Sequence, residues 1–167
     1  ESSNTLFFEE TLEWKGICVE PLPEAFEKLK DNRNCICINK CAAYYNGESK
    51  FMHVNPAVCP PSHSEKGRTS NYEKMSGLVD YYSEDHIKII DNIIDQYGGE
   101  KNTFSVECMD INDILSILNT NKIDLLSVDT EGSELSILKH IDFSKFNIDV
   151  IVVEVLYHNN ELLDYMR

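Results

Sequence analysis

The sequence lacks any apolar stretch close to the roughly 20 residues that cross a bilayer, and it contains few cations relative to its anions. Its 15 lysine and arginine residues stand against 29 aspartate and glutamate residues, which gives a formal charge of -14. A surface that acidic repels the phosphates of nucleic acids and the headgroups of anionic lipids. The composition therefore argues against nucleic-acid and membrane partners.

Local signatures of several enzyme classes are also missing. The sequence contains no Gly-x-Gly-x-x-Gly run, no P-loop, no Gly-x-Ser-x-Gly elbow and no His-Glu-x-x-His motif. No repeat of fixed period is present either. No single motif therefore assigns the chain to the P-loop nucleotidases, the serine hydrolases or the zinc proteases.

The six cysteines do not follow the spacing of a disulfide framework, and the sequence has no Asn-x-Ser/Thr sequon. Both features favour a reducing cytosol, so we expect a cytoplasmic protein. An alternative is a zinc site built from Cys35, Cys37, Cys41, His53, Cys59 and His63. Structural zinc sites usually contain Cys-x2-4-Cys knuckles, whereas two thiols one residue apart on a strand suit a small buried apolar side chain better. We therefore expect no metal at these cysteines.

What the sequence does contain is an alternation of short apolar runs with helical patterns. Hydrophobic residues make up 42% of the chain, which is enough for a core, and the length predicts a single domain. Together with the alternation, this predicts one α/β domain over residues 1–167. We expect helices over 4–13, capped by Ser3 or Asn4, and from Pro23, around 87–97, after Asp110, after Gly132 and near the C-terminus. We expect strands over 17–19, 35–39, 49–54, 104–108, 123–128 and 149–156, with a hairpin after Asn46-Gly47 and a long loop over 55–75.

Carboxylates follow three of the expected strands. Glu20 follows strand 17–19, Asp129 and Glu131 follow strand 123–128, and Glu154 ends the last strand. In parallel α/β sheets, ligands bind at the carboxyl ends of the strands, and an acid there can hold the hydroxyls of a ribose. Glu20 and Glu154 also have a simpler interpretation as solvated surface charges. Glu131 and Glu134 could be acids that complement a helix dipole, but this does not explain why Asp129 ends an apolar strand. Taken alone, the residues predict an α/β domain with an acidic ligand edge.

One series of segments runs in order along nearly the whole chain: Ser3-Asn4-Thr5, residues 14–21, Phe26, Leu29, Asn32-Arg33, Met75-Ser76-Gly77-Leu78, residues 123–134, Ile141-Asp142-Phe143 and residues 150–154. Taken together, these segments resemble the FkbM family of S-adenosylmethionine-dependent methyltransferases. The resemblance implies a Rossmann-like class I methyltransferase sheet with helices on both faces. It also implies S-adenosyl-L-methionine as cofactor and O-methylation of a hydroxyl group on a sugar, a glycan or a small molecule.

The same resemblance assigns roles to individual residues. Glu20, with Pro21, would hold the ribose of the cofactor, and Asn4 and Thr5 would open the helix near its methionine end. Cys41 and Ala42 would flank the adenine, although an Asn or Asp is more usual where Cys41 stands. Asp129 would lie beneath the methionine and the transferred methyl group.

For the methyl transfer itself we expect Asp129 to act as the base, with Glu131 or Glu154 beside it. The alternative is that these carboxylates hold a divalent cation that lowers the pKa of the acceptor hydroxyl. His158 is a weaker candidate for the base, and loop 55–75 is expected to shape the acceptor pocket.

The chain departs from the family at both ends. The family's first strand and glycine-rich loop should precede Ser3, and further strands should follow Arg167, so we expect a piece of a longer methyltransferase. The sheet should then have a gap between strands 17–19 and 123–128, and cofactor binding should be weak or absent. A non-catalytic binding module and a dinucleotide-dependent oxidoreductase are the other functions that the sequence leaves open. The oligomeric state is open as well.

Overall fold

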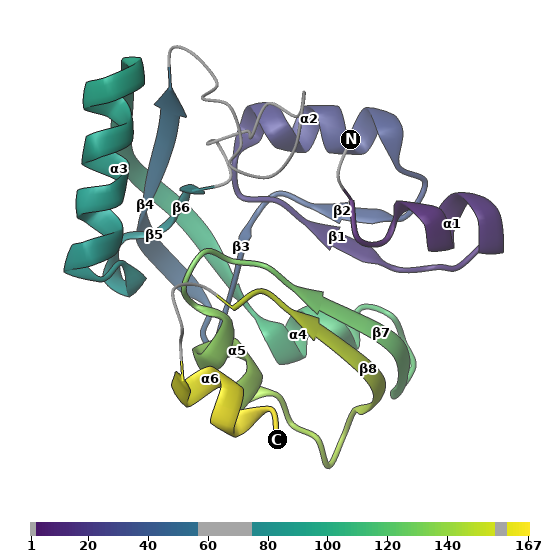
Figure 1. Ribbon diagram of the computed structural model, residues 1–167. Helices are drawn as coiled ribbons and strands as arrows, with labels where there is room; N and C mark the ends of the chain where they lie inside the picture. Colours follow the sequence, from purple (N-terminus) through teal and green to yellow (C-terminus); the bar gives the residue numbers. More distant parts are fainter. Residues whose placement is uncertain (1–2, 57–74, 156–159) are drawn as a thin grey trace. The chain divides into compact units, whose positions relative to one another are not determined.

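The structure is a computed structural model that describes residues 3–56, 75–155 and 160–167 (Figure 1). The chain divides into two compact units. Unit 1 contains Glu1–Glu48 and Val106–Arg167, and unit 2 contains Ser49–Ser105. No helix in the described part of the chain is long and apolar enough to cross a membrane.

Unit 1 carries most of the β-α alternation that the sequence predicts. Its elements are α1 (Leu6–Leu12), β1 (Ile17–Val19), α2 (Pro23–Asn32), β2 (Ile36–Ile38), β3 (Cys41–Ala43), the end of β6 (Gly99–Asp110), α4 (Ile111–Ser116), β7 (Lys122–Val128), α5 (Glu134–His140), β8 (Asn147–Val153) and α6 (Asn160–Tyr165). Helix α2 begins at Pro23, where the missing N–H and the fixed φ of proline suit the first helical turn. The mixed α/β class is thus confirmed.

Three parallel ladders organise unit 1. β1 pairs with β2 from Ile17↔Ile36 to Val19↔Ile38, and β7 pairs with β8 along its whole length. β3 pairs with the end of β6, with Cys41 opposite Cys108. Among the described strands, β1 and β7 lie in different two-stranded sheets, so the gap expected between them is present.

Helices α4, α5 and α6 pack on one face of the β7–β8 pair (Figure 1). The buried residues of this core are Ile111, Leu115, Ile123, Val128, Ile137, Leu138, Ile141, Phe146 and Leu162. On the opposite face of the pair, Val150 and Val152 are 51% and 45% exposed. Within the described residues, helices therefore cover only one face of this ladder, whereas the sequence predicted helices on both faces.

Unit 2 contains most of β4 (Gly47–Pro56), β5 (Gly77–Leu78), the 3-10 turn η2 (Val79–Tyr81), α3 (Glu84–Tyr97) and the start of β6. β4 pairs antiparallel with β5, where Phe51 lies opposite Leu78. The side chain of Ser83 caps α3 by accepting the N–H of His86, and Ile90 on its inner face is fully buried. The Oγ of Ser76 accepts the N–H of Val54 at 3.0 Å and ties β4 to the residue before β5.

Two local expectations are wrong. The hairpin across Asn46-Gly47 does not form, because β3 pairs with β6 and not with β4. Neither Ser3 nor Asn4 is the N-cap of α1: the cap position is Thr5, and its side chain makes no capping hydrogen bond. In both cases the expectation rested on neighbouring residues, whereas the contact that forms joins residues distant in sequence: β3 with β6, and the side-chain amide of Asn4 with Ser127.

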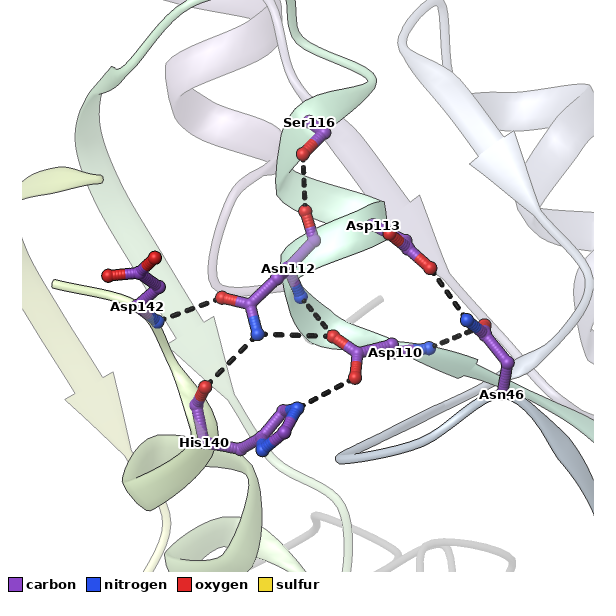
Figure 2. Close-up of polar contacts among 7 residues, drawn as sticks. All are labelled: Asn46, Asp110, Asn112, Asp113, Ser116, His140 and Asp142. Atoms are coloured by element: carbon purple, nitrogen blue, oxygen red, sulfur yellow. Dashed lines mark hydrogen bonds and ion pairs between the residues drawn. The ribbon is translucent and has the colours of Figure 1, made fainter. Parts of the chain in front are cut away.

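Helix α4 is held at its start by a polar network in unit 1 (Figure 2). Asp110 is the N-cap, as expected, and its Oδ1 accepts the N–H of Asn112 at 2.8 Å. Its Oδ2 lies 2.7 Å from Nε2 of His140. The amide of Asn112 then joins α4 to the end of α5, because it donates to the carbonyl of His140 and accepts the N–H of Asp142.

Acid is expected to weaken this network. Burial alone would raise the pKa of Asp110, but the Asn112 N–H and His140 lower it below its usual value. The native state then binds fewer protons than the unfolded chain, whose Asp titrates near 3.9. The stabilisation is therefore present above about pH 4 and is lost as the pH falls through the lower, folded pKa.

Urea unfolding between about pH 3 and pH 6 measures this effect. Asp110→Asn keeps the capping oxygen and removes the charge, so its stability should depend less on pH than that of the wild type. Asp31→Asn changes an exposed carboxylate of α2 and is the matched control. Parallel pH profiles for Asp110→Asn and the wild type would contradict the assignment.

Candidate functional site

The turn after β7 is built around a buried carboxylate. The side chain of Glu134, at the first position of α5, is 2% exposed. Its Oε1 accepts the N–H of Thr130 at 2.8 Å and the Thr130 hydroxyl at 3.1 Å, and Oε2 accepts the N–H of Gly132 at 3.0 Å. The sequence suggested only a favourable charge at a helix start, whereas the structure makes Glu134 the brace of residues 130–132.

This brace sets the direction of the neighbouring acids. Glu131 has a left-handed backbone with φ 56°, and Gly132 follows at φ 122°, a conformation that glycine adopts easily. At the end of the next strand, the N–H of Glu154 donates to the carbonyl of Val128 at 3.1 Å. As a result, Asp129, Glu131 and Glu154 each offer one carboxylate oxygen within 4.8 Å of the others.

The three carboxylates differ in exposure, since Asp129 is exposed and the other two are half-buried. Among the described residues this is the one group of three or more His, Cys, Asp or Glu side chains close enough to share a metal ion. Carboxylate oxygens are the ligands that hard divalent cations prefer, and a cation would relieve the repulsion between like charges. The three carboxylates therefore fit two roles: they can be ligands of Mg²⁺ or a similar divalent ion, or one of them can be the base that accepts a proton.

The start of the chain is attached to the same strand. The side-chain amide of Asn4 donates to Oγ of Ser127 at 3.1 Å, two residues before Asp129. Of the predicted site residues, Asn4 and Asp129 therefore belong to one neighbourhood at the end of β7. Ser127 was not predicted, because only its position in an apolar strand distinguished it.

Arg33, which was not predicted as a site residue, holds the segment from Ser3 to Glu9 in place. The guanidinium of Arg33 donates to Glu9 at 2.7 Å, to Oγ of Ser3 at 3.0 Å and to Oγ1 of Thr5 at 2.9 Å. The side chains of Arg33 and Glu9 are only 6% and 10% exposed. We call these four residues the Arg33 clamp. The Thr5 hydroxyl is engaged within the clamp.

Glu20 lies directly after β1, as predicted. One of its oxygens accepts the N–H of Leu22 at 2.9 Å. Burial raises the pKa of Glu20, and the Leu22 N–H opposes that effect in part. The amide of Asn39, the first residue after β2, donates to the carbonyls of Glu20 at 2.8 Å and Pro21 at 3.3 Å. Asn39 was not predicted, although a polar residue at the end of the adjacent strand was a usable signal.

Cys41 and Ala42 follow β2 and form the short strand β3. Cys41 is 5% exposed, and burial, aided by Cys108 and by the charge of Glu20, raises the pKa of its thiol to about 12. The Cys41 thiol is thus uncharged at neutral pH and lies within the influence of Glu20. Ala42 packs against the core of unit 1.

One cavity of unit 1 lies away from these acids. It encloses about 410 Å³ and is lined by Glu9, Glu13, Trp14, Lys15, Asn34 and Cys35. These residues precede β1 and β2, whereas Glu20 and Asn39 follow them, so the cavity is at the opposite end of the ladder. The candidate site is therefore defined by converging side chains and not by this cavity.

Some expectations fall on residues outside the described part of the chain. They are His158 as a base, Cys59 and His63 as zinc ligands, and most of loop 55–75 as a wall of the acceptor pocket.

Comparison with curated proteins and with solved structures finds no match to the chain. A family model described as the methyltransferase FkbM domain matches residues 1–167, which is the full length of the sequence. The ordered segments from Ser3 to Glu154, the acid after β1 and the acidic turn after β7 agree with that match. The chain therefore belongs to the FkbM methyltransferase family.

Proposed function

We propose that the protein transfers a methyl group from S-adenosyl-L-methionine to a hydroxyl oxygen of a sugar, a glycan or another small molecule. The observation that carries the proposal is the convergence of Asp129, Glu131 and Glu154 where β7 and β8 end. Glu20 occupies the corresponding position after β1 in the same unit. Acids at the carboxyl ends of parallel strands are placed to bind a nucleoside and to handle a proton.

The residues around Glu20 fit an adenosyl group. One carboxylate oxygen is used by Leu22, which leaves the second oxygen to accept hydrogen bonds from ribose hydroxyls. Asn39 holds the backbone of Glu20 and Pro21, so the carboxylate is oriented before a ligand arrives. A preorganised acceptor loses less entropy on binding.

Asp129 is the residue to which we assign the acceptor's proton. When bound, S-adenosylmethionine supplies a methyl group on a positively charged sulfur, and in-line transfer to the acceptor oxygen leaves S-adenosylhomocysteine. Asp129 is exposed, so an acceptor can reach its carboxylate, whereas Glu131 and Glu154 are half-buried beside it. The two neighbours either orient the acceptor hydroxyl or share a divalent cation with Asp129 that makes this hydroxyl more acidic.

Replacement of Glu20 tests the cofactor half of the proposal. In calorimetric titration of the wild type with S-adenosylhomocysteine, a Kd tighter than ~100 µM, about -5.5 kcal/mol, would support the enzyme. Glu20→Gln should weaken binding by at least about tenfold, since a charged acceptor is lost. Glu24→Gln, an exposed glutamate on α2, is the control and should bind as the wild type does. If the wild type shows no binding heat, a non-catalytic module replaces the enzyme as the better account.

Replacement of Asp129 tests the chemical half. In Asp129→Asn, transfer of labelled methyl to a panel of monosaccharides and glycosides should fall by roughly 10²–10⁴-fold, the usual contribution of general base catalysis. Affinity for S-adenosylhomocysteine should change little. Asp124→Asn alters an exposed carboxylate of the same strand and serves as the control. Undiminished turnover would remove Asp129 from the mechanism, and loss of activity in EDTA that Mg²⁺ restores would assign the cation version.

A further inference from the structure

The β1–β2 ladder gathers three thiols on one side. Cys18 in β1 lies opposite Cys37 in β2, and Cys35 precedes Cys37 by two residues, so the three side chains project from the same face. The sulfur atoms of Cys18 and Cys35 are 3.5 Å apart. The thiol of Cys37 is directed elsewhere, to the carbonyl of Cys35 at 3.6 Å.

We propose that Cys18 and Cys35 form a reversible disulfide when the protein meets a low-molecular-weight disulfide such as oxidised glutathione. A disulfide bond is about 2.05 Å long, so the two sulfurs must approach each other by roughly 1.5 Å. Cys35 lies at a bend before β2, outside the hydrogen-bonded ladder, and its backbone is therefore freer to move than that of a residue within the strand.

Access distinguishes this pair from the other closely placed thiols. Cys41 and Cys108 face each other between β3 and β6, but they are 5% and 2% exposed. Cys18 and Cys35 are only half-buried, and Cys35 also lines the cavity of about 410 Å³. A small oxidant can thus reach Cys35 without unfolding of the strand pair.

A metal explains the pair less well. In the part of the chain that the structure describes, no group of three metal-binding side chains includes Cys18, Cys35 or Cys37. Two thiols alone do not complete the four-ligand set of a structural zinc site. The geometry therefore favours a bond between the two sulfurs over a shared ion.

The reaction balances as two thiol–disulfide exchanges. One cysteine thiolate attacks oxidised glutathione and releases reduced glutathione, and the second cysteine then displaces the other glutathione. The two cysteines lose two protons and two electrons in total, and the glutathione disulfide takes them up. Burial, with the contact to Cys18, raises the pKa of Cys35 to about 12, so formation of the disulfide should accelerate as the pH rises.

Formation of the disulfide would also alter the surroundings of Glu9 in the Arg33 clamp. The side chain of Cys35 helps to lower the pKa of Glu9, and this influence changes when the sulfur joins Cys18. The inference concerns the disulfide itself and does not depend on the proposed methyl transfer.

The test equilibrates the wild-type protein in glutathione buffers from fully reduced to fully oxidised, then alkylates the remaining thiols and measures the intact mass. Oxidised protein should lose two alkylation sites and two hydrogens, and dithiothreitol should restore them. Trypsin leaves Cys35 and Cys37 in one peptide, residues 34–40, so a peptide map alone does not separate them. The matched variants Cys35→Ser and Cys37→Ser do so.

The expected result is a crosslink between residues 16–28 and 34–40 that Cys37→Ser retains and that Cys18→Ser and Cys35→Ser both lose. Four results would overturn the proposal: no crosslink in the most oxidising buffer, a crosslink that survives Cys35→Ser, a bond between other cysteines, or a stable glutathione adduct in its place. Because the decisive crosslink is sought in the wild type, a variant that fails to fold does not remove the test.

Discussion

Replacement of Arg33 by methionine is expected to destabilise unit 1 by about 3–5 kcal/mol, because it leaves the Glu9 carboxylate buried without its cation. The two side chains are 6% and 10% exposed, so water does not compensate for the loss. Ser3 and Thr5 lose their donor in the same step. Urea unfolding followed by the fluorescence of Trp14, the single tryptophan and a residue of unit 1, measures the change.

A double variant separates the ion pair from general packing. Arg33→Met together with Glu9→Met removes both charges, so it should be more stable than either single variant, although each site is altered as much. Lys30→Met removes an exposed cation of α2 and should change stability by less than about 0.5 kcal/mol. Additive effects of the two clamp substitutions would show that the charges are not coupled.

Replacement of Glu134 by alanine should cost about 2–4 kcal/mol of stability and should also weaken function. The substitution leaves the N–H groups of Thr130 and Gly132 without their acceptor in a buried turn. Without the brace, the left-handed backbone at Glu131 is no longer held, and the three-carboxylate group loses its shape. Urea unfolding and methyl-transfer assays on the same preparation measure both effects.

The conservative variant makes this prediction specific. Glu134→Gln keeps the Oε1 acceptor that serves both Thr130 and Gly132, so it should retain more than half of the lost stability and most of the activity. If glutamine and alanine were equally damaging, the negative charge rather than the hydrogen-bond geometry would be the important property of this residue. If neither changed stability, the turn would be held by other contacts.

Several elements could be predicted because their signals are local. Pro23 begins α2, Asp110 caps α4, and the apolar run over 123–128 forms β7, each determined by residues within one or two turns of chain. Glu20 and Asp129 stand at the ends of β1 and β7, which are short apolar runs of the same local kind. The candidate acids could therefore be identified from the sequence alone.

The partners of those residues could not be predicted in the same way. Asn4 looked like a helix cap but binds Ser127, and Glu134 looked like a dipole charge but supports a turn. A helix cap would use the Oδ1 acceptor of Asn4, whereas the contact with Ser127 uses its Nδ2 donor. No local pattern marks Ser127 as the partner, so only the folded chain shows this contact.

The amino-acid order by itself determined most of the strands and helices, although not β3 or β5, as well as the strand ends at which acids stand and membership of the family. The tertiary structure decided that β3 pairs with β6, that Arg33 binds Glu9 across 24 residues, and that the thiols of Cys18 and Cys35 meet. The physical reason is the distance along the chain over which each kind of interaction acts. Periodicity, capping and turn chemistry act over a few residues, whereas strand pairing, buried ion pairs and thiol contacts join residues whose proximity no local pattern encodes.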